Sequence, residues 1–305
     1  MEYIDCNLCG QDHSKPFAVI DGYRLVRCLR CGLVYLNPRP PHGEIAAQYS
    51  ADYHTKRLLG SSPKTEEEIE RAVLRSGALA DDLVRWFGPK KRLLDIGCSM
   101  GFFLACMKRR GWDVQGLDIS DWAAAFAREK LGLDCRAGTV ESVRFDTKFD
   151  ISTLFQTIEH FTDPLGSLTK IHDLIDKDGI LMIKSPNVAG FDRLWHGKKW
   201  RGFHPPFDLY YFSPRAYRTM LERAGFIITR IVYQYWNPVT HLMGMRLGGG
   251  IRADHDPDAV ITFDKDAVRK NPVYKIVNTA WTVTARCLNL KGRDLILFAK
   301  RKEDR

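Results

Sequence analysis

From residue 92 to the end of the chain, short apolar runs alternate with segments whose apolar residues recur every third or fourth position. Runs of the first kind are typical of buried strands, and segments of the second kind are typical of amphipathic helices. The predicted strands are 92–96, 113–119, 133–137, 149–155, 180–186, 226–234 and 294–301. The predicted helices are 102–111, 120–132, 163–179 and 213–225. Strands and helices in strict alternation predict an α/β fold with a mostly parallel, doubly wound sheet.

Residue types at the ends of these helices support their boundaries. Ser120 is a typical N-cap, and Gly132 is a typical stop. Asp163 followed by Pro164 places an N-cap before a proline at the first helical position. A further helix with an apolar stripe is expected over 63–87.

Two long segments, 187–212 and 235–292, interrupt the alternation. Both are rich in aromatic and basic residues, and both are too long for simple connections. Loops of this length beside an α/β sheet usually cover a ligand. We therefore expect a module at 1–41, a helical linker or cap at 42–88, and a main domain at 89–305 that carries these two segments as substrate lids.

Four of the eight cysteines form two Cys-x-x-Cys pairs near the N-terminus, each followed by a glycine. The glycines allow tight turns that point two sulfurs at one site. Disulfides and a redox pair are alternatives, but two such pairs at this spacing are typical of a closed, structural zinc site. The predicted ligands are Cys6, Cys9, Cys28 and Cys31. The proline-rich run at 34–41 is expected to close this module without a regular element.

The composition, 45% hydrophobic and 27% charged over 305 residues, is ordinary for a globular protein. No apolar run approaches the roughly 18 residues of a membrane helix. The N-terminal sequence MEYIDCNLCG lacks the basic start and apolar stretch of a secretory signal, so we expect a cytoplasmic protein. The net charge of +9 fits an anionic partner such as nucleic acid, a phosphorylated sugar or a membrane surface, and it fits a merely basic surface equally well.

The stretch LLDIGCSMGFFL at 93–104 joins the first strand of the alternation to its helix through a glycine-containing turn. A P-loop would require a Gly-Lys-Ser/Thr ending, and a dinucleotide fingerprint would require glycines that are absent from this register. Asp118 ends the second strand, where an acidic side chain accepts ribose hydroxyls in such folds. The pattern therefore favours a ligand that contains a ribose and lacks a diphosphate.

Four stretches in this order, LLDIGCSMGFFL, GLDIS, FDISTLFQTIEHFTDP and GILMIKSPN, resemble class I S-adenosylmethionine-dependent methyltransferases. The resemblance implies a Rossmann-like, seven-stranded sheet. The branch it resembles has a Glu-His pair after the fourth strand, here Glu159 and His160. The four-cysteine module and the NPRPP run are similar to the zinc-knuckle N-terminus of many bacterial members. The resemblance covers about residues 1–230 and the last strand.

The resemblance also implies a set of cofactor-binding residues at the ends of the first, second and fourth strands. They are Asp95, Gly97, Gly101, Asp118, Ile119 and Gln156. The first three would line the methionine end of the cofactor, the next two would hold its ribose and adenine, and the last would face it through its backbone. Tyr49 and Tyr53 would either close over the cofactor or simply pack the linker.

The candidate proton acceptors lie in the first long segment. The family pattern there carries a histidine at a position that Asp208 occupies in this chain, and His204 lies four residues earlier. Both residues are therefore candidate catalytic bases, and the alternative is that both only cap the loop. A carboxylate that aromatic neighbours desolvate would suit a general base.

The acceptor is predicted to be a small molecule with a hydroxyl group, of the saccharide or glycan type that related zinc-knuckle members often modify. Exocyclic base nitrogens are disfavoured, because QTIEH stands where an Asn/Asp-Pro-Pro-Tyr loop is expected. A ribosomal RNA methyltransferase and a catalytically degenerate cofactor-binding module are the alternatives. The second long segment is expected either to pack as a lid helix or to touch a membrane surface. The sequence indicates no oligomeric state.

Overall fold

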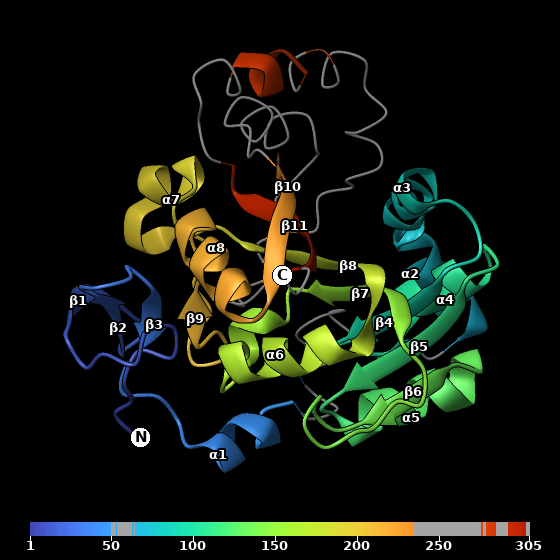
Figure 1. Cartoon of the computed structure of the whole chain (residues 1–305), viewed down its shortest axis with the longest axis horizontal. Helices are drawn as coiled ribbons and strands as arrows, with labels where there is room; N and C mark the ends of the chain where they lie inside the picture. Colours follow the sequence, from blue (N-terminus) through green and yellow to red (C-terminus); the bar gives the residue numbers. More distant parts are fainter. Residues whose placement is uncertain are drawn as a thin grey trace.

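A seven-stranded sheet with helices on both faces and a separate four-stranded sheet make up the described part of the chain (Figure 1). The computed structural model describes residues 1–49, 53, 63, 65–234, 276, 279–284 and 292–302. The second long segment expected at 235–292 therefore lies mostly outside the described residues. Among the described residues, no helix combines the length and the apolar character needed to cross a membrane.

The large sheet has the strand order β10-β11-β8-β7-β4-β5-β6. Its strands are β4 (Arg92–Ile96), β5 (Asp113–Asp118), β6 (Asp134–Ala137), β7 (Phe149–Phe155), β8 (Ile175–Pro186), β10 (Phe226–Gln234) and β11 (Asp294–Arg301). Strands β4 to β8 are parallel, and β11 is antiparallel to both of its neighbours. The predicted doubly wound, mostly parallel sheet is confirmed. The chain order reverses at β4, and ligands bind at such a switch point in open α/β sheets.

The helices that flank this sheet keep most of their predicted starts. They are α2 (Glu66–Arg75), α3 (Gly77–Phe87), α4 (Phe102–Lys108), α5 (Asp121–Leu131), α6 (Pro164–Leu174) and α8 (Pro214–Arg223). The side chains of Ser120 and Asp163 accept backbone N–H groups at the starts of α5 and α6, as predicted.

Some predicted boundaries are wrong, and the helix expected over 163–179 already ends at Leu174. The helix expected over 63–87 is two helices, because the Ser76 N–H bonds to the Val73 carbonyl in a tightened last turn and Gly77 then begins α3. Serine followed by glycine favours such a break, since both are weaker helix formers than alanine. Strand β8 begins at Ile175 and not at 180, because Ile175 already pairs with Phe149 of β7.

Each face of the sheet packs against its own helices. Leu93 of β4 and Ile151 of β7 belong to a core that includes residues of α2 to α5. Leu94 and Leu154 point to the opposite face of the sheet. They belong to a second core that includes residues of α6 and α8. Strands buried on both faces read as continuous apolar runs, which is why the sequence pattern located them.

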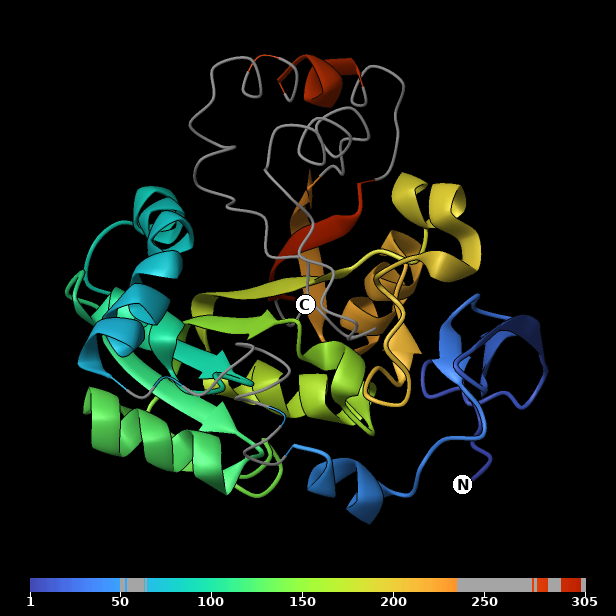
Figure 2. The same ribbon diagram turned by 180° about the vertical axis from the view of Figure 1, so that it is seen from behind.

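The N-terminal module is a small antiparallel sheet of the order β1-β2-β3-β9. Its strands are β1 (Ser14–Ile20), β2 (Tyr23–Cys28), β3 (Val34–Leu36) and β9 (Tyr210–Tyr211), and the short helix α1 (His42–Ala47) follows. The expectation of no regular element over 34–41 is therefore wrong for residues 34–36. Strand β9 comes from the first long segment, which also forms α7 (Phe191–His196) and the 3₁₀ turn Gly197–Lys199. Figures 1 and 2 show the module beside β9 and α7, at the end of the molecule away from α2–α5.

Candidate active site at the ends of the parallel strands

The turn after β4 places Asp95 and two glycines at the switch point. The Asp95 side chain is buried, and Thr153 of β7 donates its hydroxyl to Asp95 Oδ1 at 2.6 Å. Burial raises the pKa of Asp95 to about 7, although the Thr153 bond opposes this shift. Gly97 has φ +77°, and a Cβ there would lie 2.4 Å from the Thr157 side chain. This turn therefore requires glycine for its backbone conformation and for its close packing.

Asp118 ends β5 and connects two backbone segments at the same edge of the sheet. Its Oδ2 accepts the N–H of Ser99 in the turn after β4 at 2.8 Å, and its Oδ1 accepts the N–H of Ser120 at 2.9 Å. The next residue, Ile119, is 38% exposed. A carboxylate next to an exposed apolar side chain could accept the ribose hydroxyls of a nucleoside and pack against its base.

The remaining predicted cofactor residues lie along the same strand ends. Gly101 is the N-cap of α4 in the left-handed conformation, and a Cβ there would meet the side chain of Leu133 at 2.7 Å. Gln156 follows β7 with φ +54°, its N–H donates to the Lys184 carbonyl, and its side chain is exposed. Because β4, β5 and β7 are parallel neighbours, their carboxyl ends bring the predicted residues to one edge.

A histidine and a carboxylate from distant parts of the chain meet at this edge. His160 belongs to a 3₁₀ turn, Ile158–His160, that follows β7. Its Nδ1 lies 3.3 Å from Asp208 Oδ1 and 3.0 Å from the Phe207 carbonyl oxygen. The side chain of Asp208 is 5% exposed, and that of His160 is 18% exposed. The pair is thus largely shielded from water. An electrostatic contact in such surroundings is stronger than in bulk solvent.

The two predicted bases have different surroundings. Asp208 is buried beside His160, whereas the His204 ring is exposed. His204 reaches Asp208 through its backbone carbonyl, which accepts the Asp208 N–H at 3.0 Å. Sequence reasoning missed the role that His160 can take. Its signal was the Glu-His pair after the fourth strand, which served only as a family marker.

Aromatic rings surround His160. The Tyr49 ring centroid lies 5.7 Å from that of His160 and 4.9 Å from that of Tyr53, which in turn lies 5.3 Å from Phe207. The Tyr49 hydroxyl is buried and has no hydrogen-bond partner among the described residues, and burial raises its pKa. Tyr49 and Tyr53 thus lie beside the His160–Asp208 pair, and their closing over a cofactor stays a prediction.

Glu159 is a second buried carboxyl group in the same turn. It is 3% exposed, and its Oε2 has no hydrogen-bond partner among the described residues. Burial, and then the neighbouring Asp208, raise its pKa well above the ordinary value. A raised pKa favours the protonated form of the carboxyl group, which can donate a hydrogen bond.

The four predicted zinc ligands come together in the N-terminal module. The sulfurs of Cys6, Cys9, Cys28 and Cys31 all lie within 4.8 Å of one another. The Cys6–Cys31 and Cys9–Cys28 sulfur distances are both 3.4 Å, well beyond the roughly 2.05 Å of a disulfide. Four thiols around one point could hold a metal ion in tetrahedral coordination.

Comparisons with known proteins agree on the fold. A solved S-adenosylmethionine-dependent methyltransferase from Archaeoglobus fulgidus is 19% identical, with a TM-score of 0.50 over 81% of this chain and 97% of that chain. At this identity the likeness shows the fold alone.

Curated relatives match the middle of the chain. A ubiquinone biosynthesis O-methyltransferase from Ruegeria pomeroyi is 29% identical over 164 residues, 47% of this chain and 66% of that protein. Another from Actinobacillus pleuropneumoniae serotype 7 is 33% identical over 108 residues, 32% of this chain and 46% of that protein. The chain thus spans less than two thirds of the length of these relatives.

The family model described as Methyltransferase domain matches residues 66–231, which is more than half of the chain. This range contains β4 to β8, the turn with Asp95, and the His160–Asp208 contact. The chain therefore belongs to the Methyltransferase domain family, and it carries an S-adenosylmethionine-dependent methyltransferase domain.

Proposed function

We propose that this protein transfers a methyl group from S-adenosylmethionine to a hydroxyl group of a small molecule, with His160 as the general base and Asp208 as the residue that orients it. The observation that carries the proposal is the 3.3 Å contact between His160 Nδ1 and Asp208 Oδ1. The turn with His160 follows β7, so the contact lies at the same carboxyl ends of the parallel strands as Asp95 near the end of β4 and Asp118 at the end of β5.

The cofactor would bind along this edge. Asp118 accepts the ribose hydroxyls, Ile119 packs on the adenine, and the turn with Asp95, Gly97 and Gly101 approaches the methionine end. Gln156 faces the cofactor through its backbone. The support is the packing of this turn and the exposed position of Ile119 beside a buried carboxylate.

The chemistry requires a proton acceptor because a hydroxyl is a poor nucleophile until it loses its proton. A neutral imidazole is suited to this task near pH 7. With Nδ1 directed at Asp208 and at the Phe207 carbonyl, Nε2 takes the proton of the acceptor. Asp208 stabilises the imidazolium that forms, as a carboxylate does in a Ser-His-Asp triad. His204 is the competing base that the sequence suggested.

The acceptor class is inferred from the relatives and from the surrounding side chains. The curated relatives in the comparison are named O-methyltransferases, which supports a hydroxyl acceptor. The rings of Tyr49, Tyr53 and Phe207 can pack against a saccharide or against an aromatic ring. A saccharide hydroxyl, predicted from the sequence, and a phenolic hydroxyl are therefore both tested.

The N-terminal cysteines would bind one structural zinc ion. Four sulfurs in a closed shell leave no position for water, so this metal would stabilise the module and take no part in methyl transfer. The distances among the four sulfurs support this assignment.

The test is methyl transfer from radiolabelled S-adenosylmethionine to a panel of saccharides, nucleotide sugars, phenols and RNA, followed by variants on the best acceptor. His160→Gln is expected to lower turnover roughly 10²–10⁴-fold, the usual contribution of a positioned base. Cofactor affinity, measured by calorimetry, should stay near that of the wild type. His204→Gln tests the competing base and is expected to keep its turnover, because His204 is exposed.

The outcomes discriminate between the alternatives. A loss of turnover in His204→Gln, with His160→Gln unaffected, would assign the base to His204. Label transferred only to RNA would replace the small-molecule acceptor with a nucleic acid. Cofactor binding without transfer to any acceptor would favour a degenerate binding module.

A further inference from the structure

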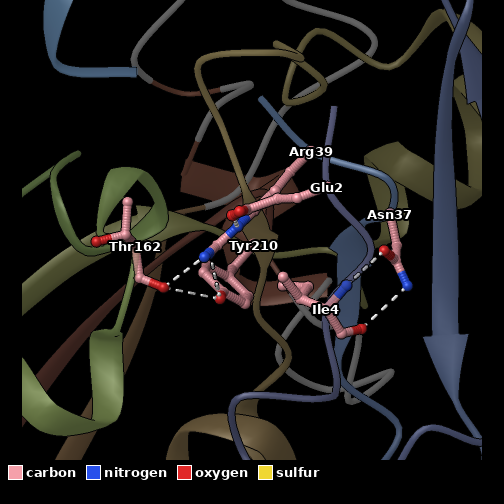
Figure 3. A network of polar contacts seen from close by, with 6 residues as sticks. All are labelled: Glu2, Ile4, Asn37, Arg39, Thr162 and Tyr210. Atoms are coloured by element: carbon pink, nitrogen blue, oxygen red, sulfur yellow. Dashed lines mark hydrogen bonds and ion pairs between the residues drawn. The ribbon is translucent and has the colours of Figure 1, made fainter. Parts of the chain in front are cut away.

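One arginine of the N-terminal module contacts both of the segments that carry the proposed catalytic pair (Figure 3). Arg39 Nη1 donates to the Thr162 carbonyl at 2.8 Å and to the Tyr210 hydroxyl at 3.2 Å. The Tyr210 hydroxyl also donates to the Thr162 carbonyl, at 3.1 Å. Thr162 lies two residues after His160, and Tyr210 lies two residues after Asp208. The three groups thus form a closed triangle beside the pair.

The arginine is itself held in place. Its side chain is 12% exposed, and its Nε pairs with Glu2 Oε1 at 2.9 Å. Its backbone exchanges two hydrogen bonds with the backbone of Glu2, at 2.7 and 2.9 Å. The Tyr210 ring is 1% exposed. A guanidinium whose Nε is held by a carboxylate and whose Nη1 donates to two partners is a rigid donor. A lysine ammonium on its flexible stem is not.

Backbone hydrogen bonds continue from this triangle to the pair. The Leu209 N–H donates to the Glu159 carbonyl at 2.9 Å, and the Leu36 N–H of β3 donates to the Leu209 carbonyl at 2.8 Å. The segment 208–210 is therefore held between the turn that carries His160 and the N-terminal sheet. Any shift of 208–210 relative to 159–162 would change the distance between Asp208 and His160.

We propose that Arg39, together with Tyr210, is a positioning residue that sets the contact between His160 and Asp208. This inference rests on the proposed function, because it assigns Arg39 an effect on the proposed base. Among the described residues, the Arg39 side chain makes hydrogen bonds to Glu2, Thr162 and Tyr210, so its effect on the pair would pass through Thr162 and Tyr210. The titratable groups near the pair include Asp208 and Tyr49, which contact His160, then Glu159 and Tyr211, which interact with Asp208, and Tyr53, which packs on Tyr49.

The expected effect concerns turnover and its pH profile. A weaker contact with Asp208 stabilises protonated imidazole less, so the acid limb of the turnover profile should move to lower pH. Misplacement of a catalytic group by about 1 Å can cost up to 10²-fold. Arg39→Met should therefore lower kcat roughly 10- to 100-fold, with cofactor affinity within about twofold of the wild type.

Three further variants separate positioning from general stability. Tyr210→Phe removes one side of the triangle and should give a smaller loss of turnover with the same direction of shift. Arg39→Lys keeps the charge and should restore only part of the activity, since one ammonium cannot reproduce the fixed geometry. Arg24→Met is the matched control, because this arginine of the same module bonds to the Asn37 carbonyl and lies over Tyr3.

A readout independent of activity distinguishes failure of this inference from failure of the proposed function. Nuclear magnetic resonance of ¹⁵N-labelled histidine should show a shifted titration midpoint for His160 in Arg39→Met and an unchanged one in Arg24→Met. If His160→Gln retains full turnover, the proposed base is wrong, while the His160 titration still reports on positioning.

The inference is overturned if Arg39→Met folds and its pH profile and His160 titration match those of the wild type. Should Arg39→Met fail to fold, Tyr210→Phe and Arg39→Lys decide the matter by the same two readouts.

Discussion

At the residue scale, Asp118 is the position where local structure and the proposed ligand meet. Its carboxylate accepts backbone N–H groups from Ser99 and Ser120, so it also fixes the turn after β4. Asp118→Ala should weaken S-adenosylmethionine binding by about 1.5–3 kcal/mol, the cost of hydrogen bonds to a charged group left unmade. Calorimetry measures this loss directly.

Two companion variants interpret the Asp118 result. Asp118→Asn keeps an oxygen acceptor and should bind the cofactor with intermediate affinity. Asp121→Ala removes an exposed acid from the first turn of α5 and should leave binding unchanged. Equal affinity in Asp118→Ala and the wild type would show that the ribose binds elsewhere.

Asp95 should make the stability of the folded protein depend on pH. Burial raises the pKa of Asp95 from 3.8 to about 7, so between these values the folded protein holds a proton that the unfolded chain has released. Stability present at low pH is therefore lost as the pH rises from about 4 to about 7. Because a pKa difference of one corresponds to about 1.4 kcal/mol, the free energy of unfolding should change by roughly 4 kcal/mol at most.

Asp95→Asn removes this titration and keeps an oxygen that accepts the Thr153 hydroxyl. The free energy of unfolding of the variant relative to the wild type should rise by roughly 2–4 kcal/mol between pH 4 and pH 7.5. Urea unfolding at a series of pH values measures it. A constant difference across this range would mean that Asp95 is already ionised at low pH in the folded protein.

The sequence predicted some site residues and missed others for a physical reason. Asp95 and Asp118 are visible because they end apolar runs, and parallel strands bring such ends together. His160 lies beside Asp208, which belongs to the segment between α7 and β9, and no local pattern in the sequence encodes this long-range contact. Asp208 was therefore predicted as a lone base, and its histidine partner was not recognised.

At the element scale, predictability follows burial and local capping. Strands such as β4 and β7 are buried along most of their length, and helices such as α5 and α6 carry their own caps. These signals lie within each segment. Strands of the N-terminal sheet carry weaker signals, since β1 is only partly buried.

Strand β9 cannot be predicted from signals within its own segment. It has two residues, Tyr210 and Tyr211, and exists because they pair with Tyr35 and Val34 of β3, far away in sequence. The first long segment was predicted as a substrate lid. That role stays a prediction, and the structure shows that the segment completes the sheet of the N-terminal module, so part of its length follows from this pairing.

At the scale of the whole molecule, the N-terminal module is joined to the methyltransferase domain by several contacts. The Asn7 side chain donates to Asp163 Oδ1 at 2.7 Å and accepts the Leu165 N–H. It thereby connects the N-terminal module to the start of α6. Arg223 of α8 donates to the Leu8 carbonyl. The domain boundary proposed at residue 41 therefore separates two units that share a sheet and polar contacts.

Because of these contacts, loss of the proposed zinc ion should affect the methyltransferase domain as well as the N-terminal module. A closed metal site by itself would affect only the folding of its own module. Here Cys28 ends β2, β2 pairs with β3, and β3 pairs with β9, which follows Asp208 by two residues. Disorder that begins at the cysteines can thus reach the proposed catalytic pair through two strand pairings.

The proposed zinc ion and its link to Asp208 can be tested together. Elemental analysis of protein purified under reducing conditions should find one zinc ion per chain, and Cys28→Ser should lower that content and melt the N-terminal sheet. Turnover should fall more than cofactor affinity, because Asp208 depends on β9 while Asp118 does not. Cys106→Ala, at a buried cysteine outside the cluster, should keep its zinc. Absence of zinc from the wild type would refute the site, and full turnover in metal-free Cys28→Ser would refute the link to Asp208.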